Sequence, residues 1–420
     1  MPIVADRSGS GEGSAIVGDP MGSSVSDPYG SLAEAPARFD ASTDLTLAIE
    51  EEFQILDRET LSLRNGFREL HALAQGTPLE EHLAGELIEC EVEVKTGRCE
   101  TFAEAAHLTI ARRRELFELV DRFGAELCST GTHPWSPWTE QSIIDTPHYR
   151  LVEESLRYVA WRNNTFGIHV HVGVQGSDRA IELMNRLRSI LPDLLALSAS
   201  SPWSEGRMTY LHSTRSQHFT RMFPRCGIPE PFAGWADYDA FCRFLLDTGS
   251  IREHTQIWWC VRPHQSFGTV ELRNADGIPD VREAIALAAF GYLMAARALR
   301  GIDEGEPVEL HAGRMLEENM WRAIRHGLSG ELIDLDGRRS VPAAERIRQL
   351  IDDAAPEVRA LGLAPFLAPI DRMLDEGNAA QRIIRRLQDG ATFEETFAEQ
   401  VRETRESVQW AGDELEATHG

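Results

Sequence analysis

Residues 166–174 read Phe-Gly-Ile-His-Val-His-Val-Gly-Val, which alternates strictly between large apolar residues and glycine or histidine. Successive side chains of a β-strand point to opposite faces, so this pattern predicts a strand with His169 and His171 side by side on one face. The flanking glycines would leave room for a ligand beside the two rings. Taken alone, the pair indicates a metal or phosphate site no more strongly than it indicates a half-solvated strand with two incidental histidines.

Three further segments separate polar from apolar residues in the same way, namely residues 44–57, 88–95 and 257–273, the last as a hairpin. Their polar faces carry Glu50, Glu52, Glu89, Glu91, Glu93, Lys95, Arg262, Glu271 and Arg273. Glu51 falls on the apolar face of the first segment, so we expect a bulge or a strand end to release it. Each strand alone is better explained as a solvated face, but four such strands in one chain favour a shared site.

Helical periodicity fills most of the remaining chain. A capping box predicts a long amphipathic helix that begins near Thr101, and the pattern from about residue 280 onward is almost wholly helical. We therefore expect an α+β fold with one largely antiparallel sheet. The apolar face of the sheet would pack against helices, its polar face would line a cleft, and the C-terminal part would be helical.

The chain is long enough to bury a large core. Its length allows one large domain or two of ordinary size, and we expect residues 41–415 to form a single domain, rich in strands to about residue 275. Residues 1–40 are rich in Gly, Ser, Pro and Ala and poor in large apolar residues, which predicts a disordered tail.

The formal net charge of −25 over 420 residues argues against broad binding to nucleic acid or to an anionic membrane, because both require a basic face. The sequence shows no signal-peptide pattern and no apolar run of about 18 residues that would span a bilayer. The six cysteines have no C-x-x-C spacing, which favours reduced thiols in a cytoplasmic protein.

Carboxylates with one or two histidines are the ligand set of Mg²⁺ or Mn²⁺, whereas zinc would more naturally take His and Cys, which are not clustered here. Arginines beside such metals suit phosphate, because guanidinium binds oxyanions in bidentate fashion. The combination indicates phosphoryl transfer. Lys95 would either contact a phosphate or pair with Glu91 or Glu93. No Walker A motif is present, so metals would hold the nucleotide.

Six motifs resemble those of the bacterial carboxylate–amine ligase family, also called glutamate–cysteine ligase type 2, whose fold is similar to the glutamine synthetase catalytic domain. They are Ile-Glu-Glu-Glu-Phe at 49–53, Val-Glu-Val-Lys-Thr-Gly at 92–97, Gly-Thr-His-Pro at 131–134, His-Val-His-Val-Gly at 169–173, Ile-Trp-Trp-Cys-Val-Arg-Pro at 257–263 and Val-Glu-Leu-Arg at 270–273. The resemblance covers residues 44–410. It implies an ATP-dependent ligase, in which a carboxylate, typically the γ-carboxylate of glutamate, forms an acyl phosphate that an amine such as that of cysteine then attacks.

The resemblance also implies roles for individual residues. Metal ligands would be Glu50, Glu52, Glu86, Glu93, His169 and Glu271, with Glu50 and Glu52 on different ions and His169 grouped with Glu271. The catalytic set would be Glu50, Glu52, Glu271 and Arg273. The ATP phosphates would be contacted by His171, Arg273, Lys95 and Arg262. Substrate anions would be bound by Arg215 and Arg221, with Tyr210 and Ser213 at the rim.

Two departures from the family pattern concern substrate identity: Cys260 stands where relatives often carry Asp, and Met208-Thr209-Tyr210 replaces a stretch that commonly contains Thr-Gly. Other functions remain as alternatives, namely a phosphotransferase similar to guanidino kinases and a non-catalytic nucleotide-binding relative. A His-x-His metallohydrolase is disfavoured because that motif normally occurs with further ligands in a parallel barrel. The sequence leaves the physiological amine and the oligomeric state open, and a homodimer is one alternative.

Overall fold

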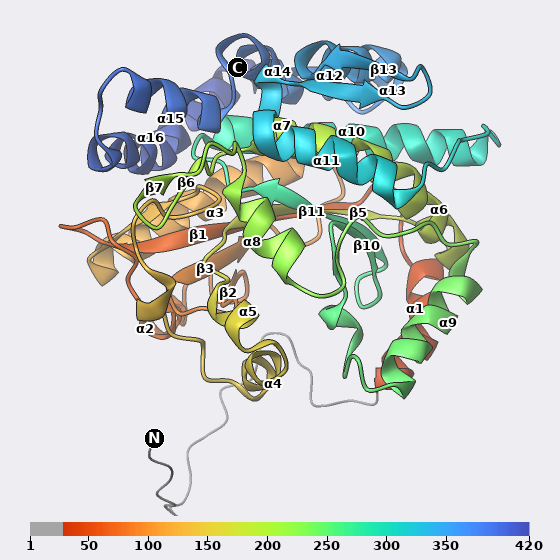
Figure 1. Cartoon of the computed structure of the whole chain (residues 1–420), viewed down its shortest axis with the longest axis horizontal. Helices are drawn as coiled ribbons and strands as arrows, with labels where there is room; N and C mark the ends of the chain where they lie inside the picture. The colour runs from red at the N-terminus through yellow and green to blue at the C-terminus, as the bar shows by residue number, and fades with distance from the viewer. Residues whose placement is uncertain (1–27, 420) are drawn as a thin grey trace, which may run out of the picture.

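The computed structural model describes residues 28–419 and centres on a seven-stranded sheet (Figure 1). The strand order is β10–β11–β5–β1–β3–β2. The strand β4 lies off this order and pairs with the C-terminal end of β1, past the residues that pair with β3. All pairings in this sheet are antiparallel, as predicted. The strands are β1 (Leu47–Asp57), β2 (Leu83–Ala84), β3 (Glu91–Lys95), β4 (Ala125–Cys128), β5 (Gly167–Gly173), β10 (Val261–His264) and β11 (Thr269–Asp276).

The register of the sheet brings the four polar faces together. On β1, Glu50 lies between Lys95 of β3 and His169 of β5. On β11, Glu271 lies between His171 of β5 and Arg262 of β10. Residues directly opposite each other in an antiparallel pair have neighbouring side chains on the same face. The four alternating segments therefore form one polar surface.

The apolar face of the sheet packs against α3 (Phe102–Phe123), α6 (Ser177–Leu187), α7 (Leu191–Ser198) and α10 (Val281–Asp303). Thr101 caps the first of these helices by accepting a hydrogen bond from Glu104 N, as the capping box predicts. Within the described part of the chain, α10 is the one helix long and apolar enough to cross a membrane, but 78% of its apolar window is buried inside the protein. It is therefore a core helix.

The other helices surround this core (Figure 1). They are α1 (Pro28–Asp40), α2 (Phe67–Ala74), α4 (Pro147–Leu156), α5 (Tyr158–Trp161), α8 (Thr214–Met222), α9 (Trp235–Asp247), α11 (Gly313–His326), α12 (Ala343–Asp353), α13 (Ala355–Ala360), α14 (Ala364–Glu376), α15 (Ala379–Gln388) and α16 (Phe393–His419). Small strand pairs are β6 (Trp203–Ser204) with β7 (Arg207–Met208), β8 (Cys226–Gly227) with β9 (Trp258–Trp259), and β12 (Glu331–Asp334) with β13 (Arg339–Pro342). The β12–β13 hairpin interrupts the helical C-terminal part.

The prediction of a disordered tail over residues 1–40 is wrong for residues 28–40, which form α1; residues 1–27 lie outside the described part. The side chains of Leu32, Ala35 and Phe39 are fully or almost fully buried, and the Phe39 ring lies 5.5 Å from that of Trp235 in α9. These three residues recur at helical spacing, so a few apolar side chains suffice to fasten α1 to the core.

Neither a bulge nor a strand end releases Glu51, contrary to the prediction. The β1–β3 register runs through it without a shift. Arg113 of α3 instead reaches Glu51, with Nε donating to Oε2 at 2.9 Å and Nη2 to Oε1 at 2.5 Å. Arg113 also donates to the carbonyls of Ile278 and Pro279 at 2.9 and 2.7 Å. A buried ion pair therefore satisfies the carboxylate on the apolar face.

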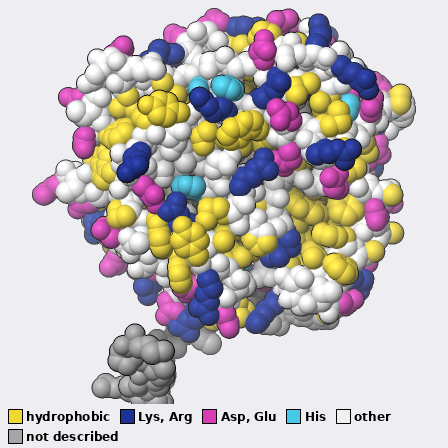
Figure 2. Space-filling view, viewed as in Figure 1, with side chains coloured by type: hydrophobic (Ala, Val, Ile, Leu, Met, Phe, Trp, Pro, Cys, Tyr) yellow, Lys and Arg dark blue, Asp and Glu magenta, His cyan; other side chains and the backbone are white. Residues whose placement is uncertain are grey.

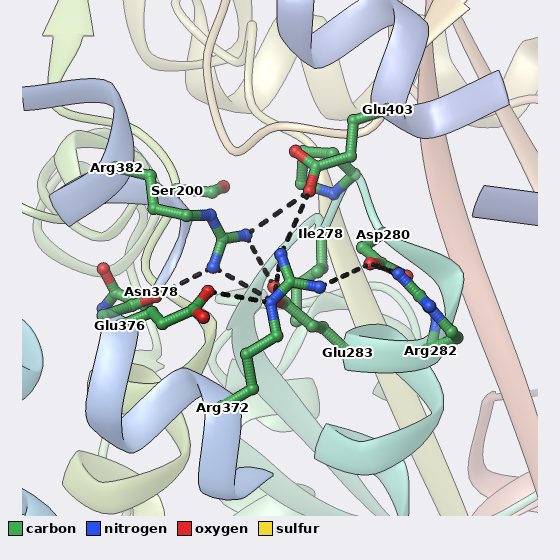
Figure 3. A network of polar contacts seen from close by, with 12 residues as sticks. Ser200, Ile278, Asp280, Arg282, Glu283, Arg372, Glu376, Asn378, Arg382 and Glu403 are labelled. Atoms are coloured by element: carbon green, nitrogen blue, oxygen red, sulfur yellow. Dashed lines mark hydrogen bonds and ion pairs between the residues drawn. The ribbon is translucent and has the colours of Figure 1, made fainter. Parts of the chain in front are cut away.

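A second ion-pair network joins the start of α10 to the C-terminal helices (Figure 3). Arg382 of α15 donates to both carboxylate oxygens of Glu283, at 3.0 and 2.8 Å. Arg372 of α14 lies 3.4 Å from Asp280, and Glu403 of α16 lies 3.7 Å from Arg382. Burial is the main cause that raises the pKa of Glu403 to about 7.

Candidate active site

A cavity opens over the polar face of the sheet. Its charged and polar lining includes Glu50, Glu52, Glu86, Glu91, Glu93, Lys95, His169, His171, Arg215, Arg262, His264, Glu271 and Arg273. Its apolar and aromatic lining includes Leu87, Tyr149, Val152, Phe219, Phe223, Trp258 and Phe267. The cavity thus contains the residues predicted to bind metal and phosphate, together with one of the four predicted to contact substrate.

Three groups of side chains in this cavity can each hold a metal ion, because their ligand atoms lie within 4.8 Å of one another. The groups are Glu50 with His171 and Glu271, Glu50 with Glu93 and His169, and Glu52 with Glu86 and Glu93. The grouping differs from the expected one, in which His169 rather than His171 joined Glu271. The register explains the difference, because His171 lies directly opposite Glu271 on the neighbouring strand.

The His171 ring fits a metal ion well. Its Nδ1 lies 2.9 Å from Thr269 Oγ1, and its buried Nε2 has no hydrogen-bond partner among the described residues. Nε2 faces Glu50 Oε2 at 3.5 Å and Glu271 Oε1 at 3.7 Å. A proton on Nδ1, donated to the Thr269 hydroxyl, leaves the Nε2 lone pair for a cation shared with two carboxylates. This donor set of oxygens with one imidazole suits Mg²⁺ or Mn²⁺.

The electrostatics differ between the two ends of the polar face. At the β3 end, burial raises the pKa of Glu86 well above its ordinary value, and the carboxylates of Glu93 and Glu52 raise it further. At the β11 end, burial acts in the same direction on Glu271, but Arg262 and Arg273 together with His171 and His264 outweigh it and hold the pKa of Glu271 well below its ordinary value. The β3 end is therefore the end at which bound cations would relieve most carboxylate repulsion.

Lys95 and two arginines of the cavity are held by carboxylates. Lys95 Nζ lies 2.7 Å from Glu93 and 3.4 Å from Glu50, so it pairs with carboxylates, which was one of the two alternatives for this residue; the phosphate contact stays a prediction. Arg262 donates to Glu271 at 2.7 Å, and Arg273 pairs with the same carboxylate. These ion pairs orient the lysine and arginine side chains, and the remaining guanidinium N–H groups can donate hydrogen bonds to anionic oxygens in the cavity.

Arg215 differs from the other cavity cations. It is 3% exposed, and within residues 28–419 it forms no salt bridge with a described carboxylate. Its Nη2 donates only to the Arg273 carbonyl, at 3.4 Å, and its buried Nε has no partner. Gly167 permits this position, because a Cβ atom there would lie 2.2 Å from Arg215 Nη2. Arg215 is therefore available for an anion of the substrate.

The other predicted substrate contacts lie outside the cavity lining. Arg221 pairs with Glu317 at 2.6 Å. Ser213 is buried, caps α8 and donates to Asp276 Oδ1 at 2.8 Å. Tyr210 has 69% of its surface exposed on the loop after β7. Of the four residues, Arg215 alone belongs to the cavity lining.

Cys260 and Glu89 also lie outside the cavity lining. Cys260 is buried, and its burial raises the pKa of the thiol well above the ordinary value, which agrees with a structural cysteine. Glu89 was predicted on the same face as Glu91, but β3 begins only at Glu91, and Glu89 pairs with Arg68 instead.

Several lining residues had no predicted role. Glu91 was predicted on the polar face from the alternation of residues 88–95, and the structure places it in the cavity lining. His264 ends β10 and Phe267 lies in the turn before β11, where their rings stack with centroids 4.2 Å apart. The wall residues on α4 and α8 carry no sequence signal, because the chain folds back over the sheet from distant positions to place them there.

Solved structures share this fold. The glutamate–cysteine ligase of Francisella tularensis, in complex with AMP, matches with a TM-score of 0.63 and 13% identity, over 88% of this chain and 89% of that one. A bifunctional glutathione synthetase of Pasteurella multocida matches with a TM-score of 0.61 and 14% identity, over 91% of this chain and 54% of that one. At such identities the likeness shows the fold, and it confirms the predicted class.

Sequence relatives are much closer. "Putative glutamate–cysteine ligase 2-3" of Rubrobacter xylanophilus is 41% identical over 345 residues, which are 82% of this chain and 93% of the relative. A second protein of that organism, the 2-2 form, is 36% identical over 363 residues, or 86% and 92% of the two chains. The profile of glutamate–cysteine ligase family 2 matches residues 46–407. The resemblance carried by the six motifs is confirmed: the chain belongs to glutamate–cysteine ligase family 2, whose members are carboxylate–amine ligases of the glutamate–cysteine ligase type.

Proposed function

We propose that the protein is an ATP-dependent ligase that joins a carboxylate, of the γ-glutamyl type, to an amine through an acyl phosphate. The observation that carries this proposal is the polar face itself, where three groups of metal-capable side chains adjoin the arginines of one cavity. Family membership supports the ligase class, and the AMP in the Francisella tularensis enzyme supports use of a nucleotide.

In the proposed reaction, a carboxylate oxygen of the substrate bonds to the γ-phosphorus of ATP while the bond to the ADP oxygen breaks. The amine nitrogen then bonds to the acyl carbon, inorganic phosphate leaves with the former carboxylate oxygen, and the nitrogen loses a proton. Mg²⁺ or Mn²⁺ held by the carboxylates and histidines would neutralise charge on the phosphates.

The residues of the chain have separate tasks in this scheme. Arg262 and Arg273 are directed by Glu271, so they can meet phosphate oxygens without reorganisation. Lys95 holds Glu50 and Glu93 in place. Arg215 binds a carboxylate of the substrates.

The partners in this proposal are small molecules, and the proposed location is the cytoplasm, where the six free cysteines would stay reduced. On the face shown in Figure 2, basic side chains are scattered among acidic and apolar ones rather than gathered in one field. Such a surface gives a polyanion little to bind.

The test is release of ADP from ATP and Mg²⁺ with glutamate and a panel of amines. Release that requires both acid and amine supports the ligase. A stable phosphorylated product that accumulates from a single acceptor, with no amide formed, would instead support the phosphotransferase alternative. No release with any pair, from a protein that still binds ATP, would favour the non-catalytic alternative. Arg348→Ala is a matched control, because Arg348 forms an exposed ion pair with Asp375 outside the cavity lining, so this variant should leave the rate unchanged.

A further inference from the structure

Glu91, at the start of β3, is a cavity carboxylate that none of the features described above explains. It is 1% exposed, and its Oε2 has no hydrogen-bond partner among the described residues. It belongs to none of the three metal-capable groups. A buried carboxylate oxygen without a donor is costly unless a ligand supplies one. Its position in the lining makes a bound N–H group the natural partner.

Arg215 lies in the same part of the cavity, and its guanidinium needs a further hydrogen-bond acceptor, whereas the Glu91 carboxylate needs a donor. Its guanidinium interacts electrostatically with Glu91, yet no salt bridge joins the two side chains, and its buried Nε has no hydrogen-bond partner within the part of the chain that the structure describes. The pair therefore offers one acceptor and one donor to a ligand. An α-amino acid carries the matching amine and carboxylate on one carbon atom.

An aromatic wall adjoins this pair. The Arg215 guanidinium stacks over Phe219 at 5.5 Å, the rings of Phe219 and Phe223 lie 5.1 Å apart, and Phe223 meets Trp258 edge to face at 5.5 Å. All three aromatic residues line the cavity. On the side of α4 and the segment before β3, the wall continues through Tyr149, Val152 and Leu87.

We propose that this region is the amine-acceptor subsite and that it selects an α-amino acid with a bulky apolar or aromatic side chain. Glu91 accepts a hydrogen bond from the amine, Arg215 binds the α-carboxylate, and the side chain packs against Phe219, Phe223 and Trp258. An acceptor as small as cysteine would leave most of this wall uncovered, and the contact area it loses lowers its affinity. This inference rests on the proposed ligase function and names its acceptor class.

The turnover test compares acceptors in pairs, with ATP, Mg²⁺ and glutamate held fixed. We expect kcat/KM for phenylalanine and leucine to exceed that for alanine and cysteine by tenfold or more, and phenylalanine to exceed phenethylamine, which lacks the carboxylate. Phe223→Ala should lower kcat/KM for phenylalanine by at least tenfold and should affect alanine far less. A preference for cysteine, or an equal loss for all acceptors in Phe223→Ala, would overturn the proposal.

A binding measurement tests the subsite separately from the reaction. Isothermal titration of the full chain with phenylalanine should show binding that Glu91→Gln and Arg215→Lys each weaken by at least tenfold, while the surface variant Arg348→Ala leaves it unchanged. Binding without any turnover would retain the subsite and refute the ligase. Turnover with other amines, without measurable binding or use of apolar amino acids, would retain the ligase and refute the subsite.

Discussion

The free energy of unfolding should depend strongly on whether one or both charges of the buried ion pair between Glu51 and Arg113 are removed. In Glu51→Leu, Arg113 loses a bidentate partner and keeps only the carbonyls of Ile278 and Pro279. Arg113 is 0% exposed, so water cannot replace the carboxylate without opening the core. An uncompensated buried charge of this kind costs about 3–5 kcal/mol of unfolding free energy.

The double variant Glu51→Leu, Arg113→Met removes both charges and leaves only the two carbonyls without a donor. Each such carbonyl costs about 1–3 kcal/mol, and the added methionine and leucine recover part of this through apolar burial. We therefore expect the double variant to be more stable than either single variant. The coupling energy in the double-mutant cycle should reach at least about 2 kcal/mol.

Urea unfolding of the four proteins at neutral pH, followed by circular dichroism and tryptophan fluorescence, measures this cycle. A coupling energy below about 0.5 kcal/mol would refute the reasoning, because it would mean that the two charges contribute independently. The side chains of Glu50 and Glu52 lie on the other face of β1, so the folded double variant should still bind Mg²⁺-ATP.

Three further variants test other parts of the structure. Gly167→Ala places a Cβ 2.2 Å from Arg215 Nη2 and 2.9 Å from the Ala275 carbonyl oxygen. We therefore expect the free energy of unfolding to fall by about 1–3 kcal/mol and the KM for the acceptor to rise. An unchanged KM would contradict the role of Arg215. Glu271→Gln should abolish turnover and weaken Mg²⁺-dependent ATP binding with an unchanged circular dichroism spectrum, and wild-type activity would exclude Glu271 from the site. The pKa of Glu403 rises from 4.5 to about 7 on folding, so the native state holds the extra proton and stability should fall by roughly 3 kcal/mol as the pH rises through that window. Glu403→Gln should flatten this part of the stability–pH curve, and an identical slope in the variant would show that Glu403 is not its source.

The sheet and its polar face could be predicted from sequence because period-two alternation is a local signal. Each strand reveals by itself which side chains share a face, as with His169 and His171 on β5. Four such faces carry carboxylates, histidines and arginines. Because the apolar sides must be buried, the simplest arrangement is one sheet on which the four polar faces lie side by side. The order of strands and the exact register still required the structure, and the register decided that His171 rather than His169 groups with Glu271.

Features that depend on distant partners could not be predicted in this way. Glu51 looked misplaced because its partner, Arg113, is on a helix 62 residues further along the chain. Ser213 looked like a rim residue because nothing local shows that its hydroxyl donates to Asp276 on β11. Helix α1 was missed because its few apolar residues gain stability only from a groove that the rest of the chain builds.

The most direct test of the account follows an oxygen atom. Glutamate labelled with ¹⁸O in its γ-carboxylate is incubated with the enzyme, Mg²⁺, unlabelled ATP and the amino acid that supports the fastest ADP release, and the inorganic phosphate formed is examined by mass spectrometry. An acyl phosphate predicts that each phosphate carries one ¹⁸O atom from the carboxylate, in step with the amide product. Phosphate that contains no ¹⁸O while amide accumulates would contradict the proposed mechanism.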